Sequence, residues 1–124
     1  MASTSFDNIP PSVYEDVSSS VTPNSSRFSA NKLVCRKYPD GKVTCYIEGK
    51  FLYAPTSGYF NTIFTLSNPI KPSTNDAFGV GVMINEIGVM PVKIITAVEL
   101  SVKSNGFSAN SYATIIAEWY VPTT

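Results

Sequence analysis

From residue 31 onward, hydrophobic and polar side chains alternate along short runs, which is the pattern of β-strands that bury one face. The clearest run is residues 42 to 48, in which Val43, Cys45 and Ile47 lie on one face and polar neighbours on the other. The same alternation recurs in residues 33–37, 60–66, 78–85, 94–103 and 112–121. Clusters of Gly, Pro, Asn and Ser separate the runs, so the pattern predicts about seven strands and no long helix.

The run at residues 78–85 has a strongly hydrophobic face. Phe78, Val80, Val82 and Ile84 share one parity and alternate with Gly79, Gly81, Met83 and Asn85. We expect the face that carries Phe78, Val80, Val82 and Ile84 to be buried, because a half-buried strand places its hydrophobic set on one side.

The last run is hydrophobic on both faces. Its odd-numbered residues, from Ala113 to Val121, form one hydrophobic face, but Tyr112, Ile116 and Tyr120 lie on the face expected to be polar. Two interpretations remain open: the strand is central and buried on both sides, or its outer face meets another subunit. Tyr112, Ile116 and Tyr120 are therefore candidate subunit-interface residues.

A hairpin is predicted around Pro39-Asp40-Gly41, because glycine tolerates positive φ and aspartate favours turns. A three-residue loop places Cys35 and Cys45 opposite each other on the same face. A disulfide between them is possible, but two buried free thiols that behave as small core residues are the favoured interpretation.

The first thirty residues differ from the rest of the chain. They contain Pro10-Pro11 and several serines, and no hydrophobic period holds across them. We predict an extended or flexible arm over residues 1–30 and an all-β domain over residues 31–124. The fold class expected for that domain is an antiparallel β-sandwich or a jelly-roll-like barrel. Phe6, Ile9 and Tyr14 are candidate anchors that dock the arm on a partner, and a disordered leader is the equal alternative.

The composition of the chain argues against nucleic acid and a membrane as partners. Nine basic and nine acidic residues give a formal net charge of zero, so the chain lacks the basic face that nucleic-acid binding requires. No run of hydrophobic residues is long enough for a membrane span. The first twenty residues do not form a signal peptide, so export by that route is not expected.

Catalytic chemistry is poorly supported. The chain has no histidine and only two cysteines, which excludes histidine-based triads and a four-cysteine zinc site. No phosphate-binding or dinucleotide-binding motif is present. We therefore expect a non-enzymatic protein without cofactor or metal, and a small carboxylate-dependent hydrolase is the weakest alternative.

A possible ligand site lies beside the loop at residues 54–58. Tyr53 and Tyr59 flank this loop, and tyrosines at strand ends can stack on sugars while their hydroxyls remain solvated. Ordinary core and rim packing is the more common role for each tyrosine taken alone.

The layout resembles the C-terminal head modules of bacteriophage fibre and baseplate receptor-binding proteins. The resemblance rests on KYPDGKVTCYIEGKF (residues 37–51), FTLSNPIKPSTNDAFGVGVMIN (residues 64–85) and the ending AEWYV, and it covers residues 31–121. It implies a homotrimeric β-sandwich on a virion that contacts a host-surface saccharide. No collagen-like or heptad shaft precedes the domain, so the arm would attach it directly to other virion proteins, as in a head fibre or a capsid decoration.

The expected function is therefore that of a virion structural protein, made in the host cytoplasm and assembled as a trimer. A free-standing, monomeric carbohydrate- or protein-binding module is the main alternative.

Overall fold

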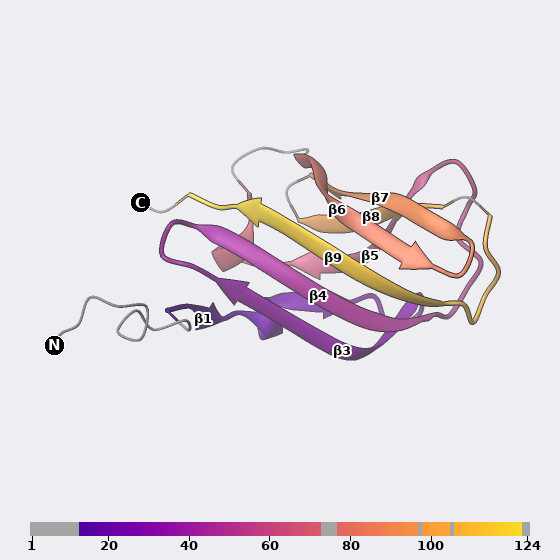
Figure 1. Cartoon of the computed structure of the whole chain (residues 1–124), viewed down its shortest axis with the longest axis horizontal. Helices are drawn as coiled ribbons and strands as arrows, with labels where there is room; N and C mark the ends of the chain where they lie inside the picture. Colours follow the sequence, from indigo (N-terminus) through magenta and orange to yellow (C-terminus); the bar gives the residue numbers. More distant parts are fainter. Residues whose placement is uncertain (1–12, 73–76, 97, 105, 123–124) are drawn as a thin grey trace, which may run out of the picture.

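The protein is described by a computed structural model that covers residues 13–72, 77–96, 98–104 and 106–122. Within these residues, nine strands form one antiparallel sheet that curls strongly into a half-barrel (Figure 1). The strands are β1 (Glu15–Asp16), β2 (Val21–Pro23), β3 (Phe28–Lys37), β4 (Lys42–Phe51), β5 (Phe60–Leu66), β6 (Ala77–Asn85), β7 (Gly88–Ile95), β8 (Glu99–Lys103) and β9 (Tyr112–Tyr120). Two short 3-10 helices are also described: η2 (Ser18–Ser20) and η3 (Asn68–Ile70). The predicted all-β, antiparallel fold class is confirmed.

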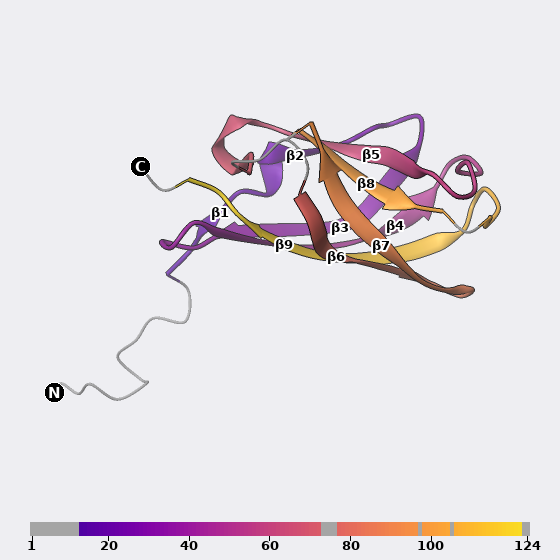
Figure 2. The same ribbon diagram turned by 90° about the horizontal axis from the view of Figure 1, so that it is seen from above.

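The curl of the sheet produces two layers. The strand order is β1-β3-β4-β9-β6-β7-β8-β5-β2. In Figure 2, β3, β4, β9 and β6 form one layer, and β2, β5 and β8 lie opposite it. A single curled sheet thus supplies both halves of a sandwich-like core. Neither helix within the described residues is long and hydrophobic enough to cross a membrane.

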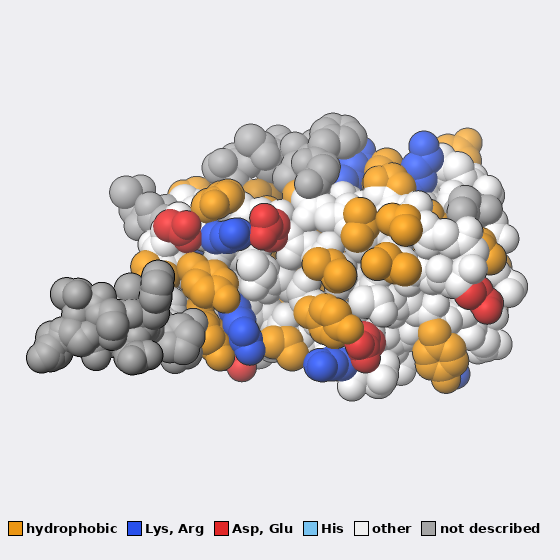
Figure 3. Space-filling view, in the orientation of Figure 1, with side chains coloured by type: hydrophobic (Ala, Val, Ile, Leu, Met, Phe, Trp, Pro, Cys, Tyr) orange, Lys and Arg blue, Asp and Glu red, His pale blue; other side chains and the backbone are white. Residues whose placement is uncertain are grey.

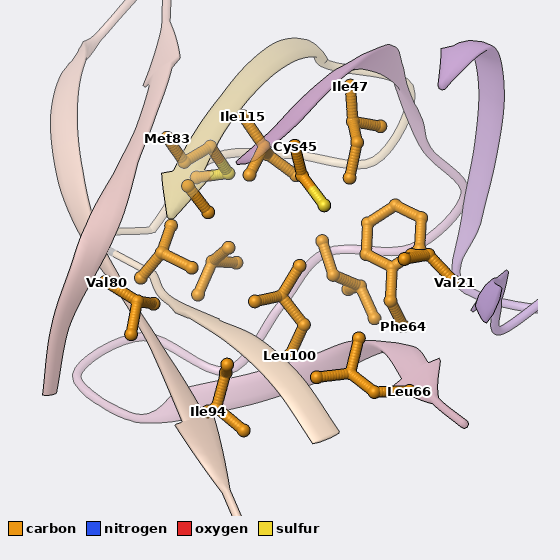
Figure 4. Close-up of a cluster of buried hydrophobic side chains, with 14 of the residues drawn as sticks. Val21, Cys45, Ile47, Phe64, Leu66, Val80, Met83, Ile94, Leu100 and Ile115 are labelled. Atoms are coloured by element: carbon orange, nitrogen blue, oxygen red, sulfur yellow. The ribbon is translucent and has the colours of Figure 1, made fainter. Parts of the chain in front are cut away.

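The core lies between these layers. Alternate residues of β4 and β9 are buried, as their sequence patterns predict. Ile47 and Ile115 point from one layer toward Phe64 and Leu100 of the other (Figure 4), and all four are fully buried. Each such side chain contributes about 1.5–3 kcal/mol through burial, so the opposite layer is required for stability.

The predicted run at residues 94–103 is two strands rather than one. β7 ends at Ile95 and β8 begins at Glu99, and these strands pair with each other. Thr96, between them, has a φ of 53°, and the Val98 N–H donates to the Ile95 carbonyl at 3.2 Å. This tight reversal preserves the parity of the flanking residues, which is why alternation alone suggested a continuous strand.

The predicted boundary at residue 30 is wrong for the part of the arm that the structure describes. β1 pairs with β3 and β2 pairs with β5, so residues 15–23 connect the two edges of the curled sheet. Val17, Val21 and Phe28 are buried. Strands of two or three residues are too short to show a period, which explains why the sequence pattern missed them. Phe6 and Ile9 lie outside the described residues.

Cys35 and Cys45 form a disulfide, so the favoured prediction of two free thiols is wrong. Their opposed placement was predicted, and their Cα atoms are 4.2 Å apart. The Cys35 N–H donates to Ser18 Oγ, and the Cys35 carbonyl accepts from the Val17 N–H, both at 2.9 Å. Cys35 and Cys45 therefore form a non-hydrogen-bonded pair, the type in which opposed residues approach most closely.

Candidate functional site

The outer face of β9 is the most unusual surface of the described structure. β9 is central, between β4 and β6, yet Tyr112, Ile116 and Tyr120 are 70%, 45% and 58% exposed. The first interpretation of this strand, burial on both sides by the chain itself, is therefore wrong. Its outer hydrophobic side chains remain available for contact with another molecule.

Strand register extends this surface into a row across the sheet. Val34, Tyr46, Ile116, Val82 and Pro91 occupy matching positions on β3, β4, β9, β6 and β7, and we call these five residues the outer-face row. Figure 3 shows hydrophobic side chains gathered over this part of the molecule.

A second hydrophobic group adjoins the outer-face row near the β6–β7 turn. Ile84 pairs with Thr114 of β9 and with Val89 of β7. Ile84 and Val89 are 41% and 63% exposed, and Ile87 in the turn is also exposed. The hydrophobic surface therefore continues from the row to the tip of this hairpin.

The outer face of β6 was not predicted correctly. Val82 and Ile84 are exposed and Met83 is buried, the reverse of the expected arrangement, although Val80 is buried as expected. Met83 lies opposite the buried residues Ile115 of β9 and Met90 of β7, so its neighbours Val82 and Ile84 face outward. The β6–β7 register shifts between Ala77 and Gly81, and Val80 lies within this bulge.

Glycine at position 81 permits the close approach of β6 to β9 beside this bulge. A Cβ atom there would overlap the Ile116 carbonyl oxygen and lie 2.6 Å from Ala117 Cα. The Gly-x-Gly spacing in the sequence was a usable signal of such an irregularity, but it does not by itself indicate which residues turn outward.

The outer face is hollowed into a groove of about 570 Å³ over β3, β4, β9 and β6. Its lining includes Val34, Tyr46, Val82 and Ile116 of the outer-face row. A smaller hollow of about 220 Å³ lies on the same side of the sheet, lined by residues that include Ile84 and Tyr112. A face with two hollows and projecting tyrosines can hold side chains of a partner by shape as well as by hydrophobic contact.

Charged groups surround the hydrophobic floor of the groove. Lys32 and Arg36 are among the lining residues, and the Lys32 Nζ lies 5.2 Å from the centre of the Tyr46 ring. Glu118 also lines the groove, and its carboxylate lies 3.4 Å from the Lys42 ammonium, which raises the pKa of Lys42. Lys32 lies opposite Glu48 and Arg36 lies opposite Asp16, so cationic groups at the β3 side of the groove alternate with acidic neighbours.

Tyr46 is oriented by a neighbour on its own strand. Its hydroxyl donates a hydrogen bond to the Glu48 carboxylate, and this bond, with desolvation and the carboxylate charge, raises the pKa of Tyr46. The ring is thereby held along β4, with one side toward Lys32.

The predicted ligand-binding tyrosines do not form a joint platform. Tyr59 is 67% exposed, but Tyr53 packs against the core, with its ring centre 6.4 Å from that of Phe51. The Arg27 guanidinium lies 5.3 Å from the Tyr53 ring centre, and burial raises the pKa of Tyr53. Saccharide binding at these residues stays a prediction, and only Tyr59 is well placed for it.

The predicted anchor Tyr14 contacts its own chain. Its ring centre lies 5.8 Å from that of Tyr38, and the Arg36 guanidinium lies 4.5 Å from the Tyr14 ring centre. Tyr14 is thus fixed at the rim of the groove, since Arg36 also lines the groove.

Among the described residues, no group of three or more acidic, histidine or cysteine side chains could hold a metal ion. A scan against protein-family models, a search of curated proteins and a search of solved structures found no match to this chain. The outer face is therefore interpreted from its own geometry.

Proposed function

We propose that this protein is a non-enzymatic structural module of a virion that assembles as a homotrimer through the outer face of β9. The observation that carries the proposal is the outer-face row, five matching positions that leave a hydrophobic surface on the middle of the sheet. An antiparallel sheet that faces water normally places polar residues on that side. Soluble proteins rarely expose large contiguous hydrophobic patches, and such patches typically mark sites of interaction with another molecule.

The surroundings of the row support a contact between proteins. Lys32, Lys42, Glu48 and Glu118 surround it with charge, and interfaces typically have a hydrophobic centre and a polar rim. The tyrosines at the two ends of the β9 outer face, Tyr112 and Tyr120, are of the residue type that is enriched at protein interfaces. The assignment to a phage fibre tip, head fibre or capsid decoration rests on the resemblance in layout and on the arm-like sequence of residues 1–12.

The mass of the full chain in solution tests the assembly. We expect light scattering on a sizing column to give the mass of three chains, and Ile116→Lys to give a single folded chain, because the lysine would place a charge in the hydrophobic centre. Thr65→Lys is the matched control, since Thr65 is an exposed position on β5 in the opposite layer.

A single chain for the unaltered protein at high concentration would falsify the trimer. A trimer that persists in Ile116→Lys would move the interface away from this face. Circular dichroism of each variant establishes that the fold is retained.

A further inference from the structure

The proposed trimer needs two different surfaces. When one patch pairs with the same patch on a second copy, the contact is closed by a twofold axis and gives a dimer. A three-membered ring requires a heterologous contact, in which one surface of each copy meets another surface of the next. The groove over the outer-face row supplies one of these surfaces.

We propose that the groove binds residues 1–12 of a neighbouring copy. This inference rests on the proposed function and specifies its partner at the same site. In a ring of three, each copy gives its N-terminal segment to the next copy and receives one from the previous copy.

The chemistry of the segment matches that of the groove. The floor of the groove is hydrophobic, and the segment carries Phe6 and Ile9 as its large hydrophobic side chains. The segment contains one acid, Asp7, and no lysine or arginine, and the β3 side of the groove presents Lys32 and Arg36. Asp7 lies between the two hydrophobic side chains in sequence, so one short stretch can satisfy both parts of the groove.

The segment joins the domain at a place from which it can reach the groove of a neighbouring copy. Tyr14 lies against Arg36, which lines the groove, so the chain enters the described structure at the groove's rim. Twelve extended residues span up to about 40 Å, which is enough to cross from one subunit to the next.

The direction of the chain just before β1 favours insertion of the segment into the groove of a neighbouring copy rather than into the groove of the same copy. Glu15 pairs with Lys37 and Asp16 pairs with Arg36 in antiparallel register, so the residues before Glu15 lead past Lys37. The groove lies in the opposite direction along β3, where Val34 lines it. The segment would have to reverse to enter its own groove, and Pro10-Pro11 favours an extended chain instead.

Cross-linking in the full chain tests which groove the segment enters. We place p-benzoylphenylalanine in place of Phe6, irradiate the purified protein and analyse it on a denaturing gel and by mass spectrometry. The expected products are two and three linked chains, with the link at lining residues of the groove such as Val34, Tyr46 or Ile116. Links only within one chain, or links outside the groove, overturn the inference.

A pair of double variants tests the energetics. The double variant Phe6→Ser with Ile9→Ser removes both hydrophobic side chains. We expect each substitution to raise the dissociation constant of the trimer by roughly tenfold or more. Ser5→Ala with Asn8→Ala changes the adjacent polar residues and should leave the trimer intact.

These outcomes separate the inference from the proposed function. If Ile116→Lys dissociates the trimer but the Phe6/Ile9 double variant does not, the faces meet directly, and only the inference fails. If the unaltered chain is a dimer whose outer faces pack against each other, the inference about residues 1–12 fails as well. If the unaltered chain is a monomer, the inference and the proposed trimer both fail.

Discussion

At the scale of single residues, hydrogen-bond partners fix the side chains that shape the outer face. Tyr46 lies beside Ile116 in the outer-face row, and its hydroxyl donates to Glu48 two residues along the same strand. Residues separated by two positions lie on the same face of a strand, so this pair could be placed from sequence. The hydrogen bond keeps the phenol neutral and its ring in position beside Lys32.

The Tyr46–Glu48 pair predicts a change in tyrosine titration. Glu48→Gln should lower the pKa of Tyr46 toward its ordinary value of 10.0, because the neutral phenol no longer donates its hydrogen bond to a carboxylate. The measurement is absorbance of tyrosinate at alkaline pH, with Glu99→Gln as the control because Glu99 accepts from Thr62 instead. Identical titrations for the unaltered chain and Glu48→Gln would contradict the assignment.

The same pair predicts how stability depends on pH. The folded-state pKa of Tyr46 is raised, so its stabilising contribution is fully present below the ordinary pKa of about 10 and is lost as pH rises through the raised value. Urea unfolding at several alkaline pH values measures this effect. The free energy of unfolding should fall more steeply with rising pH in the unaltered chain than in Tyr46→Phe, which has no phenol at position 46 to titrate.

At the scale of elements, the segment from β1 to β2 closes the half-barrel. It pairs with β3 on one edge of the sheet and with β5 on the other. Ser18 adds a side-chain hydrogen bond to β3, since Ser18 Oγ accepts the Cys35 N–H at 2.9 Å. Val17 and Val21 bury their side chains on either side of this contact.

Ser18→Ala tests the importance of this closure. It removes the acceptor of the Cys35 N–H, so we expect the free energy of unfolding to fall by about 1–2 kcal/mol. Ser19→Ala is the matched control, because Ser19 is the adjacent residue in η2 and is exposed. Equal stabilities of the two variants in urea denaturation would show that the contact does not stabilise the fold.

At the scale of the whole molecule, the position of β9 explains the unusual surface. The curl of the sheet covers only the inner face, so the outer side chains of the central strands have no covering layer within the described chain. Assembly covers such a face without changing the fold. If the chains assemble as proposed, stability depends on protein concentration, because association stabilises the folded subunits by mass action.

Thermal unfolding tests this dependence. The midpoint temperature of the unaltered chain should rise with protein concentration, and the rise should be absent in Ile116→Lys and retained in Thr65→Lys. A midpoint that is independent of concentration in all three proteins would indicate that the native protein does not associate.

Part of this structure is determined by the sequence alone. Alternation gave the buried faces of β4 and β9, where Val43, Ile47 and Ile115 are fully buried. The Pro-Asp-Gly turn placed Cys35 opposite Cys45, and parity placed Ile116 on the outer face. These features are local, since each depends on the two-residue period of a regular strand or on the geometry of one turn.

The tertiary structure decided the rest. Val82 and Ile84 face outward because Met83, between them, pairs with the buried Ile115 of β9. Val17 is buried because the curled sheet brings its two edges together. The disulfide depends on the hydrogen-bonding type of the Cys35–Cys45 pair, which Ser18 and Val17 reveal. Each of these results depends on which distant strands become neighbours, and the period of a single strand contains no information on that pairing.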